Sequence, residues 1–496
     1  MTRCATRKDE SPERLRATVA AKTPRQHKAA LGQFMTPEPV ARFMASMFRP
    51  GARVVSLLEP GAGLGALACA VVDRWMQGDL DAASIDITAY ELDERIRRHL
   101  ERTLSARTED GATFRCIGGD YLAEASRAIG RGERQYTHAI LNPPYKKIAT
   151  SSDARVHCRR VGLETVNLYS AFVGLALAQL RPQGQLVAII PRSFCNGPYY
   201  RPFREFLLER AALRHIHLFE SRDHAFRDDD VLQENVIILL ERDAPQGTVQ
   251  ITTSRDASFS DLATRIVPFS DVVKPHDSDV FIHIPSKPDV DSVAVSTAVR
   301  NTLADLGIAV STGPVVDFRL REHLVDAPSS GTVPLLYPTH FSGRVVSWPQ
   351  QSKKPNAISR NKETERWLFP LGTYTVVRRF SSKEERRRVV ATVLSPDDVD
   401  GADAIGFENH LNVFHQDKKG LPSEVAWGLF VYLNSTAIDD HLRRFSGHTQ
   451  VNATDLRAIR YPDLQTLATL GRWAIGKRTQ SPKQRAIDER IGELLR

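Results

Sequence analysis

The sequence predicts an α/β fold for the first half of the chain, built on a mostly parallel, doubly wound sheet. Short apolar runs typical of buried strands alternate there with longer runs whose apolar residues recur at helical spacing. A glycine-rich turn over residues 61–65 separates the first of these strands from the helix that follows it. Strands that alternate with helices usually pair in parallel, because each helix carries the chain back across the sheet.

Two domains and a tail are expected from the length and the pattern. A chain of 496 residues exceeds the usual size of a single hydrophobic core. After Asp243 the alternation stops, and short irregular segments rich in Ser, Pro, Asp and Arg replace it. We therefore expect a polar N-terminal tail over residues 1–28, the α/β domain over 29–290 and a second domain over 291–496.

The elements of the first domain are expected in a regular order. A helix starts at Pro37, with Thr36 placed to cap it, and a Pro-Gln-Gly turn precedes the most apolar strand. The expected strands are 54–58, 85–90, 114–118, 137–141, 185–190 and 236–240, and the expected helices are 37–47, 66–75, 93–104, 169–180 and 202–213.

Composition restricts the class of protein. The formal net charge of +8 favours a polyanionic partner. Five scattered cysteines without CxxC spacing argue against a disulfide framework and against a zinc site, so we expect no metal and a reducing compartment. The longest apolar stretch, residues 171–180, is too short to cross a bilayer, and the N-terminus lacks the apolar segment of a secretory signal. The sequence therefore predicts a soluble cytoplasmic protein with no membrane partner.

The residues Asn142-Pro143-Pro144-Tyr145 follow the strand expected at 137–141. The two prolines fix φ and remove backbone donors, which leaves the neighbouring carbonyl groups free to accept hydrogen bonds. The asparagine adds another acceptor and the tyrosine adds a flat face. This combination favours binding of a planar group with an exocyclic amine, such as a nucleobase.

Glycines and acidic residues at other strand ends indicate a cofactor crevice. Gly61 and Gly63 allow a ligand to approach the backbone closely where the first strand turns into a helix. Glu91 and Asp120 each close a later strand, a position from which a carboxylate binds ribose or accepts from a base amine. Alternatively, these two acidic residues only cap helices or lie in solvent. The absence of GxGxxG and GxxxxGK[ST] spacing argues against nicotinamide, flavin and ATP hydrolysis.

The order of these motifs resembles a known family, the γ-class adenine-N6 DNA methyltransferases of type II restriction–modification systems. Residues 34–37, the turn 59–65, Glu91, Asp120 and the segment 142–145 follow one another as they do in TaqI-like enzymes and in PstI/BsuBI-like modification enzymes. The resemblance covers about 30–240 motif by motif. Three later segments look like parts of target-recognition domains, namely 311–314, 378–382 and 447–452.

The resemblance implies a fold, a reaction and partners. The first domain would be a Rossmann-like class I methyltransferase domain, and the second an α+β domain that recognises the DNA target. The enzyme would move a methyl group from S-adenosylmethionine to the N6 amine of an adenine flipped out of double-stranded DNA. It would protect host DNA, with a cognate restriction endonuclease as a separate chain and no stable complex required.

The resemblance also assigns the cofactor residues. Thr36 and Glu59 would contact the methionine end of the cofactor, and Glu91 would hold its ribose. Asp120 would accept from its adenine amine, with Tyr121 packed on the ring.

For the target base, the resemblance implies that Asn142 and the carbonyl of Pro143 accept from the N6 amine while Tyr145 stacks on the ring. A second stacking aromatic is expected before the last strand, and Phe226 is the candidate. The alternative for Phe226 is an ordinary core position.

The DNA contacts are expected in the second domain. Residues 374–388 interleave aromatic, hydroxyl and cationic side chains, which suits phosphate contacts by Arg378 and Arg379. His448, Gln450 and Asn452 are candidates to contact base edges or the DNA backbone. The alternative is that this charge run is a solvated face.

Other reactions use similar motifs. Cytosine-N4 methylation has nearly the same chemistry, although a leading serine in place of Asn142 is commoner there. Methylation of a protein glutamine or of RNA also uses Asn-Pro-Pro-Tyr, usually without a long basic C-terminal domain. From another class, the chain would be an inactive specificity subunit, which the intact acidic residues argue against.

Overall fold

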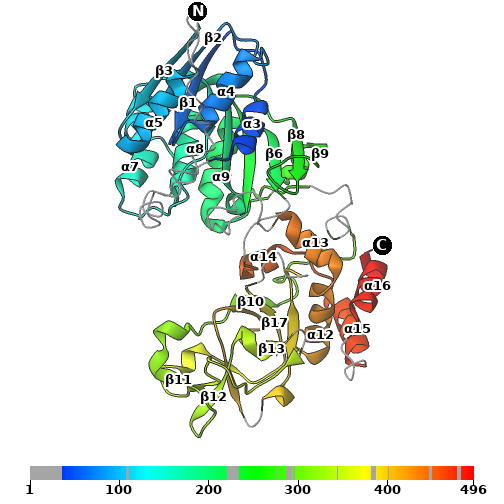
Figure 1. The fold of residues 1–496 in the computed structure, drawn as a ribbon. Helices are drawn as coiled ribbons and strands as arrows, with labels where there is room; N and C mark the ends of the chain where they lie inside the picture. Colours follow the sequence, from blue (N-terminus) through cyan, green and yellow to red (C-terminus); the bar gives the residue numbers. More distant parts are fainter. Residues whose placement is uncertain are drawn as a thin grey trace, which may run out of the picture. The chain divides into compact units, whose positions relative to one another are not determined.

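The structure is a computed structural model, and the chain divides into two compact units, Met1–Lys287 and Pro288–Arg496. The sequence places the domain boundary near residue 290. Each unit is described by itself, and Figure 1 labels its elements. The structure describes residues 36–107, 111–219, 234–275, 277–285, 293, 296–342, 345–380, 387–399, 402–445, 450–476 and 482–495.

Within the described residues of unit 1, nine strands form one sheet in the order β3-β2-β1-β4-β5-β7-β6-β8-β9. The strands from β3 to β5 are mutually parallel, whereas β7 runs antiparallel to both β5 and β6. This arrangement confirms the expected mostly parallel α/β sheet. The strands are β1 (Val54–Pro60), β2 (Ser84–Tyr90), β3 (Ala112–Ile117), β4 (Tyr136–Leu141), β5 (Leu180–Pro191), β6 (Ala211–Phe219), β7 (Asn235–Arg242), β8 (Thr248–Ser254) and β9 (Ala263–Pro268).

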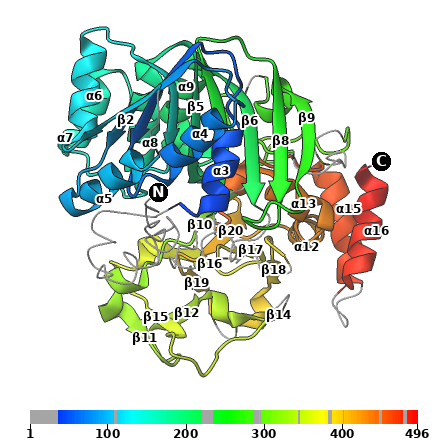
Figure 2. The same ribbon diagram turned by 45° about the horizontal axis from the view of Figure 1, so that its top comes forward.

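Helices cover both faces of this sheet, as Figures 1 and 2 show. One face packs against α3 (Glu38–Ser46), α4 (Ala66–Met76) and α5 (Glu94–Ser105), which bury their apolar stripes against alternate residues of β1, β2 and β4. The other face packs against α6, α8 and α9. The helices on this second side are α6 (Tyr121–Gly130), α7 (Asp153–Arg160), α8 (Leu168–Gln179) and α9 (Arg201–Arg210).

Several expected boundaries were wrong. Pro37, not Thr36, is the N-cap residue of α3, and no side chain caps that helix. The helix expected to continue to residue 213 ends at Arg210, because β6 begins at Ala211. This strand was missed because His215 and His217 interrupt its apolar pattern, yet both are buried and both rings bond to the hydroxyl of Thr252 on β8. The helix α6 and the strands β8 and β9 were also missed.

Unit 2 combines mostly antiparallel sheets with helices, as the expected α+β class requires; β12 and β19 are a parallel pair. One sheet has the order β10-β20-β17-β18, and a second has the order β11-β15-β12-β19-β16. The strands are β10 (Ala309–Thr312), β11 (Leu324–Val325), β12 (Thr332–Leu336), β13 (Phe341–Ser342), β14 (Val345–Val346), β15 (Ala357–Ser359), β16 (Leu368–Pro370), β17 (Tyr374–Arg378), β18 (Ala391–Leu394), β19 (Ala404–Phe407) and β20 (Leu411–His415). The longer helices are α12 (Ser423–Leu433), α13 (Thr436–Phe445), α14 (Ala453–Ala458), α15 (Leu464–Ile475) and α16 (Gln484–Leu495).

The part of the chain that the structure describes contains neither a candidate membrane-spanning helix nor a candidate metal-binding cluster. No helix in this part of the chain is long and apolar enough to span a membrane. Among the same residues, no group of three or more His, Cys, Asp or Glu side chains is arranged to hold a metal ion.

Candidate active site

The glycine-rich turn connects β1 to α4 and is hydrogen-bonded to the end of the neighbouring strand β2. The backbone N–H groups of Gly61 and Ala62 both donate to the carbonyl oxygen of Tyr90, at 2.9 and 2.8 Å. Gly61, Gly63 and Gly65 have φ values of +74°, +56° and +84°, which other residues rarely adopt. A Cβ atom on Gly63 would meet no described atom within 4 Å. The turn therefore presents an open backbone surface at Gly63 beside the end of β2.

Glu59 lies beneath this turn as a buried carboxyl group. Its side chain is 1 % exposed, and its Oε2 accepts from the backbone N–H of Ala68 at 3.0 Å. Burial raises the pKa of Glu59 to about 8; the bond from Ala68 lowers it in part, and the nearby Glu91 raises it further. The carboxyl group is therefore protonated at neutral pH until a cation approaches it.

Glu91 follows β2 and ties the turn to the next helix. Its Oε2 accepts from the N–H of Gly63 and its Oε1 from the N–H of Asp93, both at 2.9 Å. Burial raises the pKa of Glu91, and these backbone bonds partly offset the effect. The next residue, Leu92, is 63 % exposed, which is unusual for a leucine at the end of a central strand. The sequence analysis missed Leu92, although an apolar residue between Glu91 and Asp93 was a usable signal.

Asp120 and Tyr121 lie where β3 leads into α6. Asp120 is exposed and caps α6 by accepting from the N–H of Leu122 at 2.9 Å. Helix capping is the role that the sequence analysis gave as the alternative to cofactor binding. Tyr121 is only 3 % exposed, and its hydroxyl donates to Oε1 of Gln179 at 2.9 Å. The ring lies in the hydrophobic core of unit 1. The cofactor roles expected for both residues stay predictions.

Asn142 follows β4 and is held from two sides. Its Nδ2 donates to the hydroxyl of Thr36 at 3.1 Å, and the hydroxyl of Tyr145 donates to its Oδ1 at 3.2 Å. Thr36 is itself 7 % exposed, so residues more than one hundred positions apart meet in a partly buried site. These bonds orient the amide, because its nitrogen faces Thr36 and its oxygen faces the other way.

The ring of Tyr145 is also fixed by its neighbours. Its hydroxyl lies 3.3 Å from the carbonyl oxygen of Ile189 on β5, and its ring meets Tyr169 edge to face with centroids 6.1 Å apart. Tyr169 in turn stacks on Tyr200 at 5.8 Å, and Nδ2 of Asn167 donates to the Tyr200 hydroxyl. Burial raises the pKa of Tyr145, which keeps its hydroxyl protonated. The aromatic side chain is therefore preorganised beside the Asn142 amide.

Two buried arginines hold the loop that follows β5, which the sequence analysis did not single out. Arg192 pairs with Glu234 at 2.7 Å, with the two side chains 3 % and 2 % exposed. Arg204 is fully buried and donates to the carbonyl oxygens of Phe194 and Gly197, both at 2.8 Å. It also donates to the carbonyl oxygen of Asp279 at 2.6 Å.

The structure describes some of the remaining predicted site residues but not all of them. Phe226 and His448 lie outside the described residues. Arg378, Arg379, Gln450 and Asn452 belong to unit 2, where Nε of Arg379 donates to Oδ1 of Asn452 at 3.3 Å. Residue 450 pairs with Phe380 in an isolated bridge.

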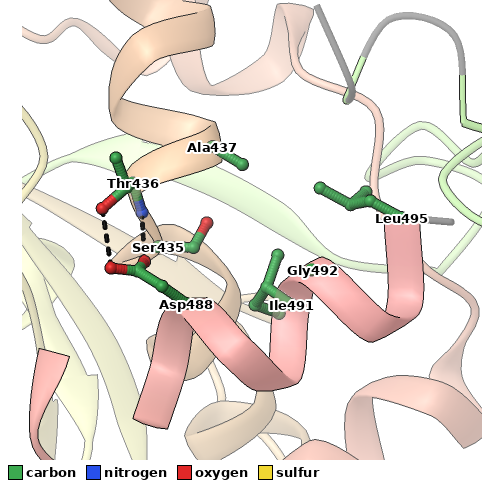
Figure 3. A pocket seen from close by; sticks show the side chains of 7 residues that line it. All are labelled: Ser435, Thr436, Ala437, Asp488, Ile491, Gly492 and Leu495. Atoms are coloured by element: carbon green, nitrogen blue, oxygen red, sulfur yellow. Dashed lines mark hydrogen bonds between the residues drawn. The ribbon is translucent and has the colours of Figure 1, made fainter. Parts of the chain in front are cut away.

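Unit 2 also has a hollow between α13 and α16, which Figure 3 shows. Asp488 caps α13 there by accepting from the N–H and the hydroxyl of Thr436, at 2.7 and 2.8 Å. The other lining side chains include Ala437, Ile491 and Leu495. The hydroxyl of Ser435 donates to the carbonyl oxygen of Tyr432, so the polar groups of this hollow already bond to the protein.

The chain is similar to known methyltransferases of restriction–modification systems. Residues 82–226 match the family described as Eco57I restriction-modification methylase. The chain is 46% identical over 479 residues to the type II methyltransferase M.BsuBI of Bacillus subtilis, covering 95% of each protein. It is 41% identical over 452 residues to the type II methyltransferase M.PstI of Providencia stuartii, covering 89% of this chain and 88% of that protein. It is 27% identical over 246 residues to the type II methyltransferase M.AccI of Acinetobacter calcoaceticus, covering 48% of this chain and 41% of that protein.

The raised pKa of Glu59 predicts a pH-dependent stability. Its contribution to stability is fully present below the unfolded pKa of 4.5 and is lost as the pH rises through about 8. We expect Glu59→Gln, which cannot ionise, to gain roughly 3–5 kcal/mol in unfolding free energy relative to wild type between pH 5 and 8.5, at about 1.36 kcal/mol per pKa unit. Urea unfolding at several pH values measures this difference. The exposed Glu209→Gln is the matched control, and parallel pH profiles for wild type and Glu59→Gln would contradict the assignment.

Proposed function

Because the chain belongs to the type II methyltransferases of DNA restriction–modification systems, we propose that it methylates the N6 amine of an adenine in double-stranded DNA. The observation that carries this proposal is the amide of Asn142, oriented by Thr36 and Tyr145 at the end of β4. The residues around this amide have proposed roles in binding the cofactor and the target base. S-adenosylmethionine is the proposed methyl donor.

The turn and its acidic neighbours fit this donor. The buried carboxyl of Glu59 suits the cationic amino group of a methionine moiety, because the approach of a cation favours the ionised form of the carboxyl group. The open backbone at Gly63 suits close approach of a ligand, and Glu91 beside it suits ribose hydroxyls. The exposed Leu92 offers an apolar surface for a purine ring. Thr36, Gly61, Asp120 and Tyr121 complete the proposed cofactor residues.

The proposed role of Asn142 is to accept a hydrogen bond from the target amine. The lone pair of an adenine amine is delocalised into the ring, so the nitrogen is a poor nucleophile. Acceptors at Oδ1 of Asn142 and at the carbonyl of Pro143 draw the two amine hydrogens out of the ring plane and free the lone pair. When bound, S-adenosylmethionine supplies a sulfonium methyl group for in-line attack. The bond from the nitrogen to the methyl carbon would form as the carbon–sulfur bond breaks and leaves a neutral thioether, and the nitrogen would then lose one proton to solvent. The chain would contribute positioning and electrostatic stabilisation.

The target base must leave the duplex to reach these acceptors. Tyr145 is proposed to stack on the flipped base, and its ring is already fixed against Tyr169. Phe226 is proposed as the second stacking residue. The strands on either side of it, β6 and β7, end and begin at the same edge of the sheet as β5 ends. Each stacking contact contributes about 1–3 kcal/mol.

The proposed base is adenine rather than cytosine because the motif begins with asparagine. Cytosine-N4 methylation is the second candidate, since its amine needs the same acceptors. Unit 2 is proposed as the target-recognition domain, with Arg378, Arg379, His448, Gln450 and Asn452 among its candidate DNA contacts. A cognate restriction endonuclease is proposed as a separate chain.

The modified base itself tests the function. We expect expression in a host without DNA methylation to produce N6-methyladenine in one sequence motif, read by single-molecule sequencing. N4-methylcytosine in a motif would replace the adenine proposal by its cytosine neighbour. Unmodified DNA together with methylated RNA or protein would contradict both.

The acceptor role of Asn142 predicts a selective loss of turnover. We expect Asn142→Ala to lower kcat by at least about 10²–10³-fold, the usual effect of removing one electrostatic contact to the reacting group. Cofactor and DNA affinities should stay within a few-fold of wild type. Asn142→Asp keeps acceptor oxygens and should retain more activity than Asn142→Ala. Equal losses of binding and turnover would show that Asn142 is structural.

The buried Glu59 predicts proton release on cofactor binding. At pH 7 its carboxyl group is mostly protonated, since its pKa is raised to about 8, and pairing with the amino group should ionise it. Calorimetric titration with S-adenosylmethionine in two buffers of different ionisation enthalpy should show release of close to one proton. Glu59→Gln should bind more weakly and release none. Release of no proton by wild type would exclude this pairing.

A further inference from the structure

Four separate segments meet at one end of the sheet β10-β20-β17 in unit 2. The register pairs Thr312 with Asn412 and Arg378 with Leu411, so β10 and β17 end where β20 begins. Three of these segments belong to the stretches that resemble target-recognition domains. The fourth is the turn Glu408-Asn409-His410, which the sequence analysis did not single out.

This turn is rigid because its backbone groups are bonded on both sides. The N–H of Asn409 donates to the carbonyl oxygen of Val315 at 2.9 Å, and the N–H of His410 donates to Oε2 of Glu408 at 3.0 Å. Gly313 packs directly against it, since a Cβ atom there would lie 2.2 Å from the carbonyl oxygen of Glu408. The turn therefore holds its side chains in fixed directions.

Arg379 bonds inward to this turn and also to the side chain of Asn452. Arg379 donates from its backbone N–H to the carbonyl of His410 at 2.8 Å and from Nη1 to the carbonyl of Asn409 at 3.1 Å. Its Nε donates to Oδ1 of Asn452, and Asn452 caps α14 together with Asp455. The guanidinium of Arg379 and the amide of Asn452 thus both bond to other groups of the protein. A residue whose role is to contact DNA directly would instead keep its polar groups for the DNA.

Two partly exposed side chains at this turn, those of Phe380 and His410, are planar rings. Phe380 is 47 % exposed and the side chain of His410 is 38 % exposed, and their rings lie 4.8 Å apart at 55°. Nδ1 of His410 lies 2.7 Å from Oε1 of the fully buried Glu408, which leaves Nε2 on the opposite edge of the ring. Oδ1 of Asn409 is enclosed and has no hydrogen-bond partner among the described residues.

We infer that Phe380 and His410 form a surface that contacts the bases of duplex DNA, and that Arg379 and Asn452 are positioning residues for it. This inference rests on the proposed DNA substrate but not on which base is methylated. Exposed aromatic rings stack on bases or enter base steps, and imidazole groups bond to base edges. A rigid turn suits this task because less conformational entropy is lost on binding.

The first test changes the exposed ring. The full chain is assayed on a duplex that carries the motif found in the wild-type methylation map and on duplexes with single base changes. We expect Phe380→Ala and His410→Ala to lower kcat/KM on the cognate duplex by about tenfold or more, the loss expected for one stacking contact. Discrimination against the changed duplexes should shrink as well. Tm and the Kd for S-adenosylmethionine should match wild type, and Phe380→Tyr should restore activity.

Leu464→Ala is the matched control, because Leu464 is a similarly exposed apolar residue of unit 2, at 41 %. It should leave kcat/KM and discrimination unchanged. Phe380→Ala and His410→Ala variants that behave like this control would overturn the inference. A wild-type enzyme that methylates cytosine would refute the adenine proposal and leave this comparison valid, since the comparison uses whichever motif is modified.

The second test separates positioning from phosphate contact at Arg379. The Kd of a fluorescent cognate duplex is measured by anisotropy at several salt concentrations for wild type and Arg379→Gln. A positioning residue should lower Tm and weaken binding without changing the slope of log Kd against log salt. A phosphate contact would instead reduce that slope by about 1 and leave Tm unchanged. The latter result would overturn the positioning role.

Discussion

One carbonyl oxygen organises the candidate active site. The oxygen of Tyr90, at the end of β2, accepts from the N–H groups of both Gly61 and Ala62. This pair of bonds fixes the turn after β1 against the end of β2, and so brings Glu91 within 2.9 Å of the N–H of Gly63. Parallel strands place their carboxyl ends at one edge of a sheet, so Asn142 after β4 is presented at the same edge as this turn. A change in the β1–β2 register would displace all of these groups together.

The candidate site contains two buried carboxyl groups whose ionisation is unfavourable, and backbone N–H groups around them reduce that cost. Glu59 and Glu91 are both buried carboxyl groups; burial raises the pKa of each, and the charge of Glu91 further raises the pKa of Glu59. The backbone N–H groups of Ala68, Gly63 and Asp93 offset part of that cost. Such an arrangement favours a cationic ligand, because the ligand supplies the countercharge that the protein lacks. Buried carboxyl groups of this kind lower stability, and the proposed cofactor would offset that cost when bound.

Local patterns predicted the parts of the fold that local chemistry controls. The strands before the glycine turn and before Asn142 each contain a short apolar run, so both were found from the sequence, as was the fold class. The strand β6 was missed because the partners of His215 and His217, the hydroxyl groups of Thr252 and Ser254, lie on β8, more than thirty residues along the chain. Likewise, the contacts from Thr36 to Asn142 and from Arg379 to the 408–410 turn join distant segments. The sequence motifs predicted several residues of the candidate active site and of the region around the 408–410 turn. The hydrogen-bond partners and the direction of each side chain depend on tertiary packing and were not predicted.

The contacts of Arg204 bear on how this protein can be divided for experiments. This buried cation has Phe194 and Gly197 on one side and the carbonyl of Asp279 on the other, and it lies 5.1 Å from the centre of the Phe281 ring. The sheet of unit 1 ends at Pro268, yet these later residues complete the support of the loop after β5. A truncated catalytic fragment that stops at the last strand would remove the Asp279 acceptor and the Phe281 ring from a buried guanidinium. Fragment boundaries for expression therefore belong after residue 285, beyond the described segment that contains both partners.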